Sequence, residues 1–170
     1  MSRAFVRESD FPQMPELPPQ VSPLPPGAKN FITAAGAQRL RDELAQLTKI
    51  ARPRLAAAPV DDTDAKRELQ VLDQRIRYLQ QSLRTAEIVP PPEGPRDVVR
   101  FGATVTVREN NGAETPYRIV GVDETDPDRG EVSWLSPISR ALVNTRLGER
   151  IVFKAPRGAK ELEIVAITYE

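Results

Sequence analysis

The side chains available for chemistry are limited, because the chain of 170 residues contains neither histidine nor cysteine. This composition excludes imidazole-dependent triads, thiolate nucleophiles, the usual zinc ligands and a disulfide framework. Any chemistry must therefore rest on carboxylates, hydroxyl groups, lysine or arginine. Three carboxylates, those of Asp61, Asp62 and Asp64, stand close together in a short turn over residues 59–64.

The same three aspartates also have a structural interpretation. Asp is a favoured N-cap residue, and carboxylates in the first helical turn interact favourably with the helix macrodipole. A helix that begins near Asp62 or Thr63 would explain all three without any reaction. A third interpretation is an acidic group that repels nucleic acid phosphates.

Two helices must position this turn. Apolar residues on either side of it recur at spacings of three and four, which is the pattern of a coiled-coil seam. These residues are Leu40, Leu44, Leu47 and Ala51 before the turn, and Leu69, Leu72, Ile76, Leu79, Leu83 and Ala86 after it. We therefore expect an antiparallel α-helical coiled-coil hairpin over residues 31–88, called the finger below. Thr33 is its expected first N-cap, and Pro53 predicts a kink or an early end of the first arm.

Proline-rich segments flank the finger. Residues 1–30 contain seven of the 17 prolines and predict an extended, disordered arm. This arm is either a simple tail or a docking segment. Its candidate anchors are Phe5, Val6, Phe11 and Met14. Residues 89–96 contain four more prolines and predict a stiff linker.

Residues 97–170, called the C-terminal domain below, have the alternating pattern of β-strands. We expect strands around residues 98–101, 104–107, 117–122, 132–135, 148–153 and 162–169. Asn110-Asn111-Gly112 predicts a hairpin turn, and Ser136 followed by Pro137 predicts the start of a short helix. This pattern indicates a compact antiparallel sheet with one short helix, so the whole chain is expected to be of the α+β class.

The charge balance narrows the possible partners. Lys and Arg number 24, as do Asp and Glu, so the formal net charge is zero. A neutral chain argues against tight binding to bare DNA. No apolar run is long enough to span a bilayer, and the first residues lack the apolar core of a signal peptide. We therefore expect a soluble, cytoplasmic monomer that does not interact with membranes.

Residues 31–170 resemble the Gre transcript-cleavage factors of bacterial RNA polymerase, and GreB more than GreA. The resemblance rests on four segments that occur in the family's order and spacing. They are Phe31-Ile32-Thr33 with Leu40 to Leu47, Asp73-Gln74-Arg75-Ile76-Arg77-Tyr78-Leu79, Tyr117-Arg118-Ile119-Val120-Gly121, and Ser136-Pro137-Ile138-Ser139-Arg140-Ala141-Leu142 followed by Leu147-Gly148.

The resemblance implies a fold and a mode of action. The C-terminal domain would be FKBP-like and would dock at the rim of the polymerase secondary channel, while the finger enters the channel. Asp61, Asp62 and Asp64 would help to hold a magnesium ion that is shared with the polymerase, and no metal would be bound by this protein alone. Ser136, Pro137 and Arg140 would face the polymerase rim; alternatively, they form a capped short helix with a solvated arginine.

The arginines of the second arm also have two interpretations. Arg75 and Arg77, together with Arg84, could face nucleic acid within the elongation complex. Alternatively, their aliphatic stems simply cover the flank of the coiled coil.

The sequence departs from the family pattern at the tip. Residues 60–66 lack the family's Ser-Glu-Asn-Ala core and its tip aromatic. The finger is also shorter than in typical GreB by about a dozen residues, which removes about 9 Å of reach from each arm at 1.5 Å per residue. The chain resembles Rnk in having a short finger.

We therefore expect an accessory regulator of elongation that binds RNA polymerase at the secondary channel and stimulates little or no cleavage. Transcript RNA and DNA would be contacted only within the elongation complex. The alternative is a true cleavage factor that uses the tip aspartates, in which case the polymerase would still carry out the reaction. A third candidate, prolyl isomerase activity, needs an aromatic pocket. The available aromatic residues, most of them expected in the core, are Phe101, Tyr117, Trp134, Phe153 and Tyr169.

Overall fold

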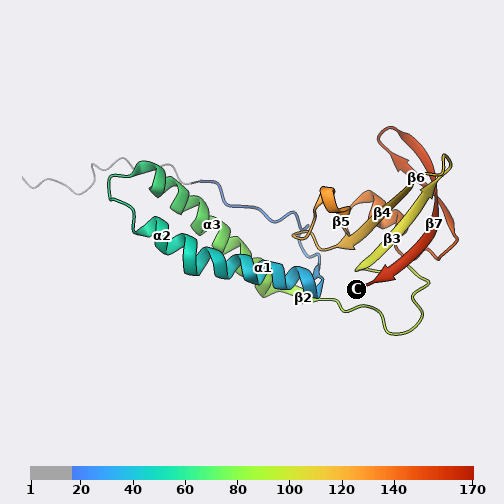
Figure 1. Ribbon diagram of the computed structural model, residues 1–170, viewed down its shortest axis with the longest axis horizontal. Coiled ribbons are helices and arrows are strands. Elements are labelled where there is room, and N and C mark those ends of the chain that lie inside the picture. Colours follow the sequence, from blue (N-terminus) through green and yellow to red (C-terminus); the bar gives the residue numbers. More distant parts are fainter. Residues whose placement is uncertain (1–16) are drawn as a thin grey trace, which may run out of the picture.

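The computed structural model describes residues 17–170 and shows helices at one end and a sheet at the other (Figure 1). The first part of the predicted proline-rich arm, with the candidate anchors Phe5, Val6, Phe11 and Met14, lies outside the described residues. The finger contains β1 (Asn30–Ile32), α1 (Ala34–Gln46), the π-helix η1 (Leu47–Ala51), α2 (Arg52–Ala56), α3 (Thr63–Thr85) and β2 (Ala86–Ile88). The C-terminal domain contains β3 (Ala103–Glu109), β4 (Glu114–Val120), the 3₁₀-helix η2 (Pro127–Arg129), β5 (Glu131–Ser133), α4 (Pro137–Leu142), β6 (Arg150–Ala155) and β7 (Gly158–Tyr169).

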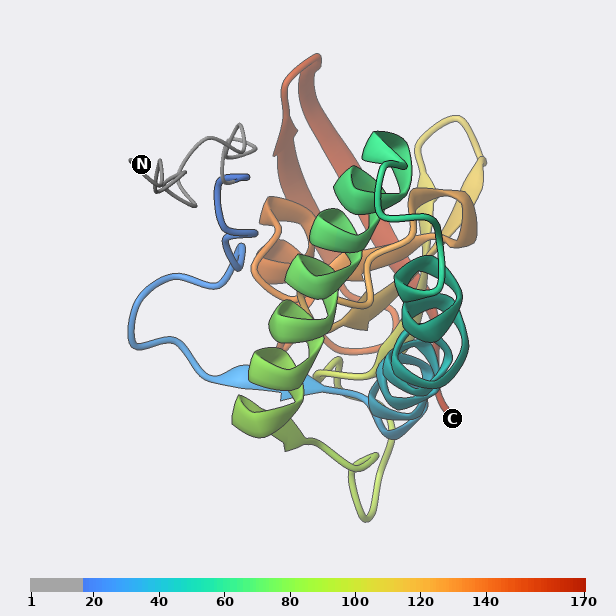
Figure 2. The same cartoon turned by 90° about the vertical axis from the view of Figure 1, so that its left-hand side faces the viewer.

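The two helical arms of the finger lie side by side in both views (Figures 1 and 2). Residues of the predicted apolar stripes meet between them, with Leu40 and Leu79 buried and Leu44, Leu47 and Leu83 packed around them. Thr33 caps α1, because its side chain accepts a hydrogen bond from the Gly36 N–H, as predicted. Coiled-coil geometry in this packing stays a prediction.

The first arm remains helical through Pro53, but its geometry changes just before it. Proline has no N–H to donate, and its ring crowds the carbonyl four residues earlier. The preceding residues form the wider π-helix η1, which accommodates this conflict. Within it, the Thr48 hydroxyl donates to the Leu44 carbonyl oxygen at 2.7 Å.

A short parallel strand pair closes the base of the finger, and the sequence patterns did not predict it. β1 pairs with β2 in the register Asn30↔Ala86 to Ile32↔Ile88. The buried Asn30 side chain donates to the Ser82 carbonyl oxygen at 3.0 Å. The start and the end of the finger are therefore tied together where it meets the C-terminal domain.

The sheet of the C-terminal domain has the strand order β5-β4-β3-β7-β6. Three of its pairs are antiparallel, but β4 and β5 are parallel, so the prediction of a wholly antiparallel sheet is wrong. The reason lies in the connection, because the chain leaves β4, turns through η2 and returns at Gly130 (φ +67°) in the same direction. The sheet is therefore mixed, and the α+β class holds.

Some of the elements predicted for this domain are present, and one predicted strand is not. The turn at Gly112 (φ +83°) and the short helix α4 are present as predicted. The predicted strand over 98–101 is not formed, because the chain turns at Gly102 (φ +83°) and only Val98 makes an isolated bridge, with Arg146. The core is built from buried residues on β3, β4, β7 and α4, together with Val99 in the segment before β3. An FKBP-like topology stays a prediction.

Across residues 17–170, none of the helices is both long and apolar enough to cross a membrane.

Candidate functional site

The three tip aspartates are exposed where the turn after α2 leads into the start of α3, at the end of the finger remote from the sheet (Figure 1). Asp62 is the N-cap of α3, because its Oδ1 accepts a hydrogen bond from the Ala65 N–H at 2.9 Å. Asp64 lies in the first turn of the same helix. The capping interpretation is therefore confirmed for Asp62.

A magnesium role for the tip stays a prediction. Among residues 17–170, no group of three or more acidic side chains is arranged to hold a metal ion. The hard carboxylate oxygens of Asp61 and Asp64 suit magnesium, and Asp62 has one oxygen left outside its cap. These residues fit a partial ligand set for an ion whose other ligands come from a partner.

Two of the four arginines of α3, Arg75 and Arg77, have different surroundings. Arg75 forms a bidentate ion pair with Glu43 across the arms, with Nε–Oε1 and Nη2–Oε2 distances of 2.7 and 2.9 Å. Its guanidinium also lies 5.5 Å from the centroid of the Tyr78 ring. Arg75 thus joins the two arms, which suits the structural interpretation of this residue.

Arg77 is exposed and lies beside the described part of the proline-rich arm. Residues 17–30 and one face of α3 line a groove of about 790 Å³ that includes Arg77. The Gln74 side-chain amide donates a hydrogen bond to the Pro18 carbonyl oxygen in this region. Contact of Arg75 or Arg77 with nucleic acid stays a prediction.

The predicted rim-facing residues begin α4 in the C-terminal domain. Ser136 is the N-cap and accepts a hydrogen bond from the Ser139 N–H at 3.3 Å, and Pro137 occupies the first turn. Pro137 and Arg140 are exposed, whereas Ser139 is fully buried. The structure thus places the tip aspartates at the start of α3, the two arginines further along α3, and the third predicted group on α4 in the other domain. Contact of α4 with a polymerase stays a prediction.

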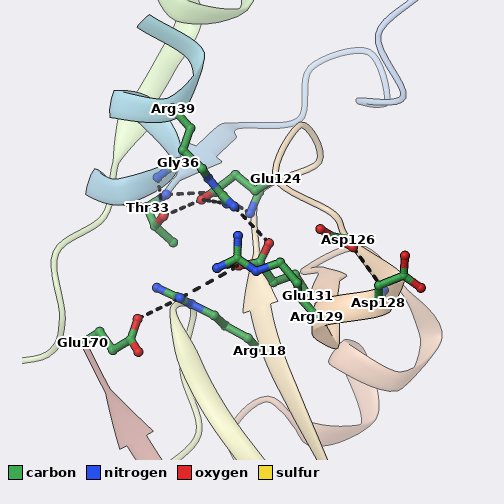
Figure 3. Close-up of polar contacts among 11 residues, drawn as sticks. Thr33, Gly36, Arg39, Arg118, Glu124, Asp126, Asp128, Arg129, Glu131 and Glu170 are labelled. Carbon is green, nitrogen blue, oxygen red and sulfur yellow. Dashed lines mark hydrogen bonds and ion pairs between the residues drawn. The ribbon is translucent and has the colours of Figure 1, made fainter. Parts of the chain in front are cut away.

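Two buried carboxylates were missed by the sequence patterns. Glu124 and Glu131 lie between the finger and the C-terminal domain, and both are less than 6% exposed (Figure 3). Arg39 of α1 reaches Glu131 at 3.2 Å, and Arg118 and Arg129 approach it at 3.9 and 3.8 Å. The sequence around Glu124 shows only an acidic run over residues 123–128, which does not include Glu131. The partners of these two glutamates lie up to 92 residues away, so no local pattern predicts the contacts.

The family model and the relatives that match this chain belong to the same family. The model of the C-terminal domain of the GreA/GreB transcription elongation factors matches residues 94–169. The chain is 38% identical over 154 residues to transcription elongation factor GreB of Neisseria meningitidis serogroup B, covering 83% of this chain and 94% of that protein. It is 36% identical over 152 residues to GreA of Alkalilimnicola ehrlichii, covering 81% and 96%. A solved GreA/GreB factor from Nitrosomonas europaea is 27% identical, covers 83% of this chain and 100% of that chain, and has a TM-score of 0.42.

The match with the Neisseria protein extends over most of both chains. This similarity extends over 83% of this chain, well beyond the residues 94–169 that the family model matches. The chain therefore belongs to the GreA/GreB family of transcription elongation factors.

Proposed function

We propose that this protein regulates transcription elongation by binding RNA polymerase at its secondary channel, with little or no stimulation of transcript cleavage. It acts as an accessory factor, and any RNA cleavage is carried out by the polymerase. RNA polymerase is its partner, and transcript and template are met only within the elongation complex. The observation that carries the proposal is the tip, where one carboxylate oxygen of Asp62 is already engaged in capping α3.

The shape of the molecule supports a channel-binding role. α3 has 23 residues and is therefore about 35 Å long. The tip turn lies at the end of this finger away from the sheet (Figure 1). In this proposal, residues 31–88 enter the channel, and residues 97–170 stay at its rim with Pro137 and Arg140 toward the polymerase.

The proposed weakness in cleavage follows from the geometry that magnesium requires. Mg²⁺ needs oxygen ligands at about 2.0–2.1 Å in near-octahedral geometry, so a tip that stops several ångströms short cannot complete the site. One oxygen of Asp62 is already engaged by the backbone. Occupying the channel has no such requirement, because it depends on the volume of the finger.

A true cleavage factor is the second candidate. The exposure of Asp61 and Asp64 favours it, because both carboxylates are free to meet a metal ion presented by the polymerase. In that case, the tip aspartates would help to hold the magnesium ion that activates water for phosphoryl chemistry.

Cleavage of nascent RNA in stalled, backtracked polymerase complexes separates the two candidates. The assay compares the wild-type protein with a D61N/D62N/D64N variant, and Asp128→Asn in the C-terminal domain serves as a matched control. We expect cleavage close to the rate of the polymerase alone in every case. Acceleration by the wild-type and control proteins that is lost in the triple variant would instead show a true cleavage factor.

A further inference from the structure

A single loop of the C-terminal domain contacts both arms of the finger at its base. This loop, residues 121–124, directly follows β4 and is called the base loop below. It turns on itself, with the Glu124 N–H donating to the Gly121 carbonyl oxygen at 3.1 Å. Its last two residues, Asp123 and Glu124, carry adjacent carboxylates.

Glu124 holds the start of the first arm. Only 1% of its side chain is exposed. Its Oε2 accepts hydrogen bonds from the backbone N–H groups of Thr33 at 2.9 Å and Gly121 at 2.7 Å, and its Oε1 accepts one from the Thr33 hydroxyl. The Arg39 guanidinium lies 3.9 Å from the same carboxylate (Figure 3). Because Thr33 is the N-cap of α1, Glu124 fixes the point where that helix begins.

Asp123 holds the second arm in the same way. One of its oxygens accepts a hydrogen bond from the Tyr78 hydroxyl, and the other accepts one from the Ser82 hydroxyl. Tyr78 and Ser82 are four residues apart on α3, so they present one face of that helix to the loop. Adjacent carboxylates therefore hold different arms.

Two glycines allow this close approach. A Cβ atom on Gly36 of α1 would lie 1.8 Å from Oε1 of Glu124. A Cβ atom on Gly121 would lie 2.4 Å from the Phe31 carbonyl oxygen. The backbone of the finger and the base loop thus meet at distances that no other residue type permits without a shift.

Apolar contacts alone would not define the direction of the finger. The Phe31 ring packs against Phe101 at 5.8 Å and Trp134 at 5.2 Å between ring centroids. Such burial is non-directional, whereas hydrogen bonds depend on both distance and angle. Taking a carboxylate out of water is unfavourable unless it is fully partnered, so the buried Glu124 carboxylate contributes geometry more than net stability.

We propose that Asp123 and Glu124 are positioning residues, which set the direction of the finger relative to the C-terminal domain and so the place that the tip reaches. The finger acts as a lever, since a rotation of about 10° at the base of a helix about 35 Å long moves its far end by about 6 Å. This proposal deepens the proposed function and rests on it, because a finger must be aimed to enter a channel while the other domain stays at the rim.

Distances between spin labels in the free protein test the proposal. The natural chain has no cysteine, so cysteines at Val60 and Val152, which are 85% and 67% exposed, can be labelled selectively. In this background we compare Asp123→Ala and Glu124→Ala with Glu114→Ala, an exposed carboxylate on β4. Circular dichroism and thermal unfolding verify that each variant is folded.

The expected result is one narrow distance distribution in the parent and in the Glu114→Ala variant. The two base-loop variants should shift or broaden it by about 5 Å or more, given the lever arm of the finger. An unchanged distribution in both would overturn the proposal. If Glu124→Ala does not fold, Asp123→Ala and a Y78F/S82A variant, which removes the partners of Asp123 and leaves the loop intact, decide the question.

The spin-label distances and the polymerase assays test the positioning proposal and the proposed function separately. Label distances in the free protein do not depend on any partner, so they decide the positioning claim even if the wild-type protein fails to bind polymerase. If it does bind, the base-loop variants should lose at least tenfold in their ability to occupy the channel, and Glu114→Ala should lose none. Full occupancy by variants whose finger is misdirected would overturn the link between direction and function.

Discussion

At the scale of single residues, Asp62 has an identifiable structural role. Its side chain caps α3 by accepting a hydrogen bond from the Ala65 N–H. Replacing a capping Asp by Ala typically removes about 1 kcal/mol of stability. We predict that Asp62→Ala lowers the free energy of unfolding by about that amount. Urea denaturation followed by circular dichroism measures it.

The neighbouring Asp61 is the matched control. It is exposed and precedes the cap, so Asp61→Ala should leave the unfolding free energy within about 0.5 kcal/mol of the parent. Equal losses in the two variants would mean that the local charge, rather than the cap, stabilises the start of α3.

Tyr78 makes the joint between the domains sensitive to alkaline pH. Burial, together with the hydrogen bond to Asp123, raises the pKa of Tyr78 to about 12. The unfolded chain loses this proton near pH 10, whereas the folded chain retains it up to about pH 12. The stabilising contribution is therefore complete below pH 10 and is lost progressively as the pH rises toward 12.

We predict that Tyr78→Phe removes this part of the alkaline loss of stability. Tyr78 keeps partial contact with solvent, which screens the effect, so the expected difference is about 1 kcal/mol between pH 9 and pH 12. Unfolding free energies of both proteins across this range supply the measurement, and Tyr117→Phe serves as the control. Parallel curves for the wild type and Tyr78→Phe would contradict the prediction.

At the scale of elements, α1 contains a glycine where propensity favours alanine. In an exposed helix interior, Gly→Ala stabilises by about 1 kcal/mol. Gly36 is buried against Glu124, whose carboxylate would have to move and lose hydrogen bonds to admit a Cβ atom. We predict the opposite sign, a loss of about 1–3 kcal/mol for Gly36→Ala, measured by chemical denaturation.

The exposed neighbour Ala35 provides the comparison for this prediction. Ala35→Gly should cost about 1 kcal/mol through propensity alone and should leave the base loop undisturbed. Stabilisation by Gly36→Ala would show that the Glu124 carboxylate can move away from Thr33 without loss of stability. It would also contradict the proposal that Glu124 positions the finger.

Elements governed by local rules could be predicted from the sequence. Thr33, Asp62 and Ser136 cap their helices through residues no more than three positions away. The hairpin turn at Gly112 is equally local. The parallel pairing of β4 with β5 and of β1 with β2 could not be predicted, because the partners of a strand depend on the path of the chain between them.

The residues of the candidate site likewise divide into those that local sequence predicts and those whose contacts depend on distant partners. The exposed aspartates at the tip could be placed from the spacing of apolar residues around one short turn. Glu124 could not, because its partner Thr33 lies 91 residues earlier and in a different domain of the proposed division. Arg75 was visible in the sequence, but its pairing with Glu43 depends on how the two arms pack.

At the scale of the whole molecule, a finger and a compact domain are joined through a small set of directional contacts. The base loop holds both arms, and β1 and β2 tie the start of the finger to its end. In the proposal above, these contacts give the finger a defined direction relative to the C-terminal domain. In the proposed function, this finger occupies the polymerase channel without completing the cleavage site.

Competition in a polymerase assay measures directly whether the finger occupies the channel. Cleavage of backtracked RNA by a cleavage-active Gre factor is measured at a fixed concentration while this protein is added in increasing amounts. We predict that cleavage falls toward the rate of the polymerase alone, because the two factors exclude each other from the channel. Cleavage that stays constant at saturating amounts of this protein, or that rises above the rate with the Gre factor alone, would contradict the account.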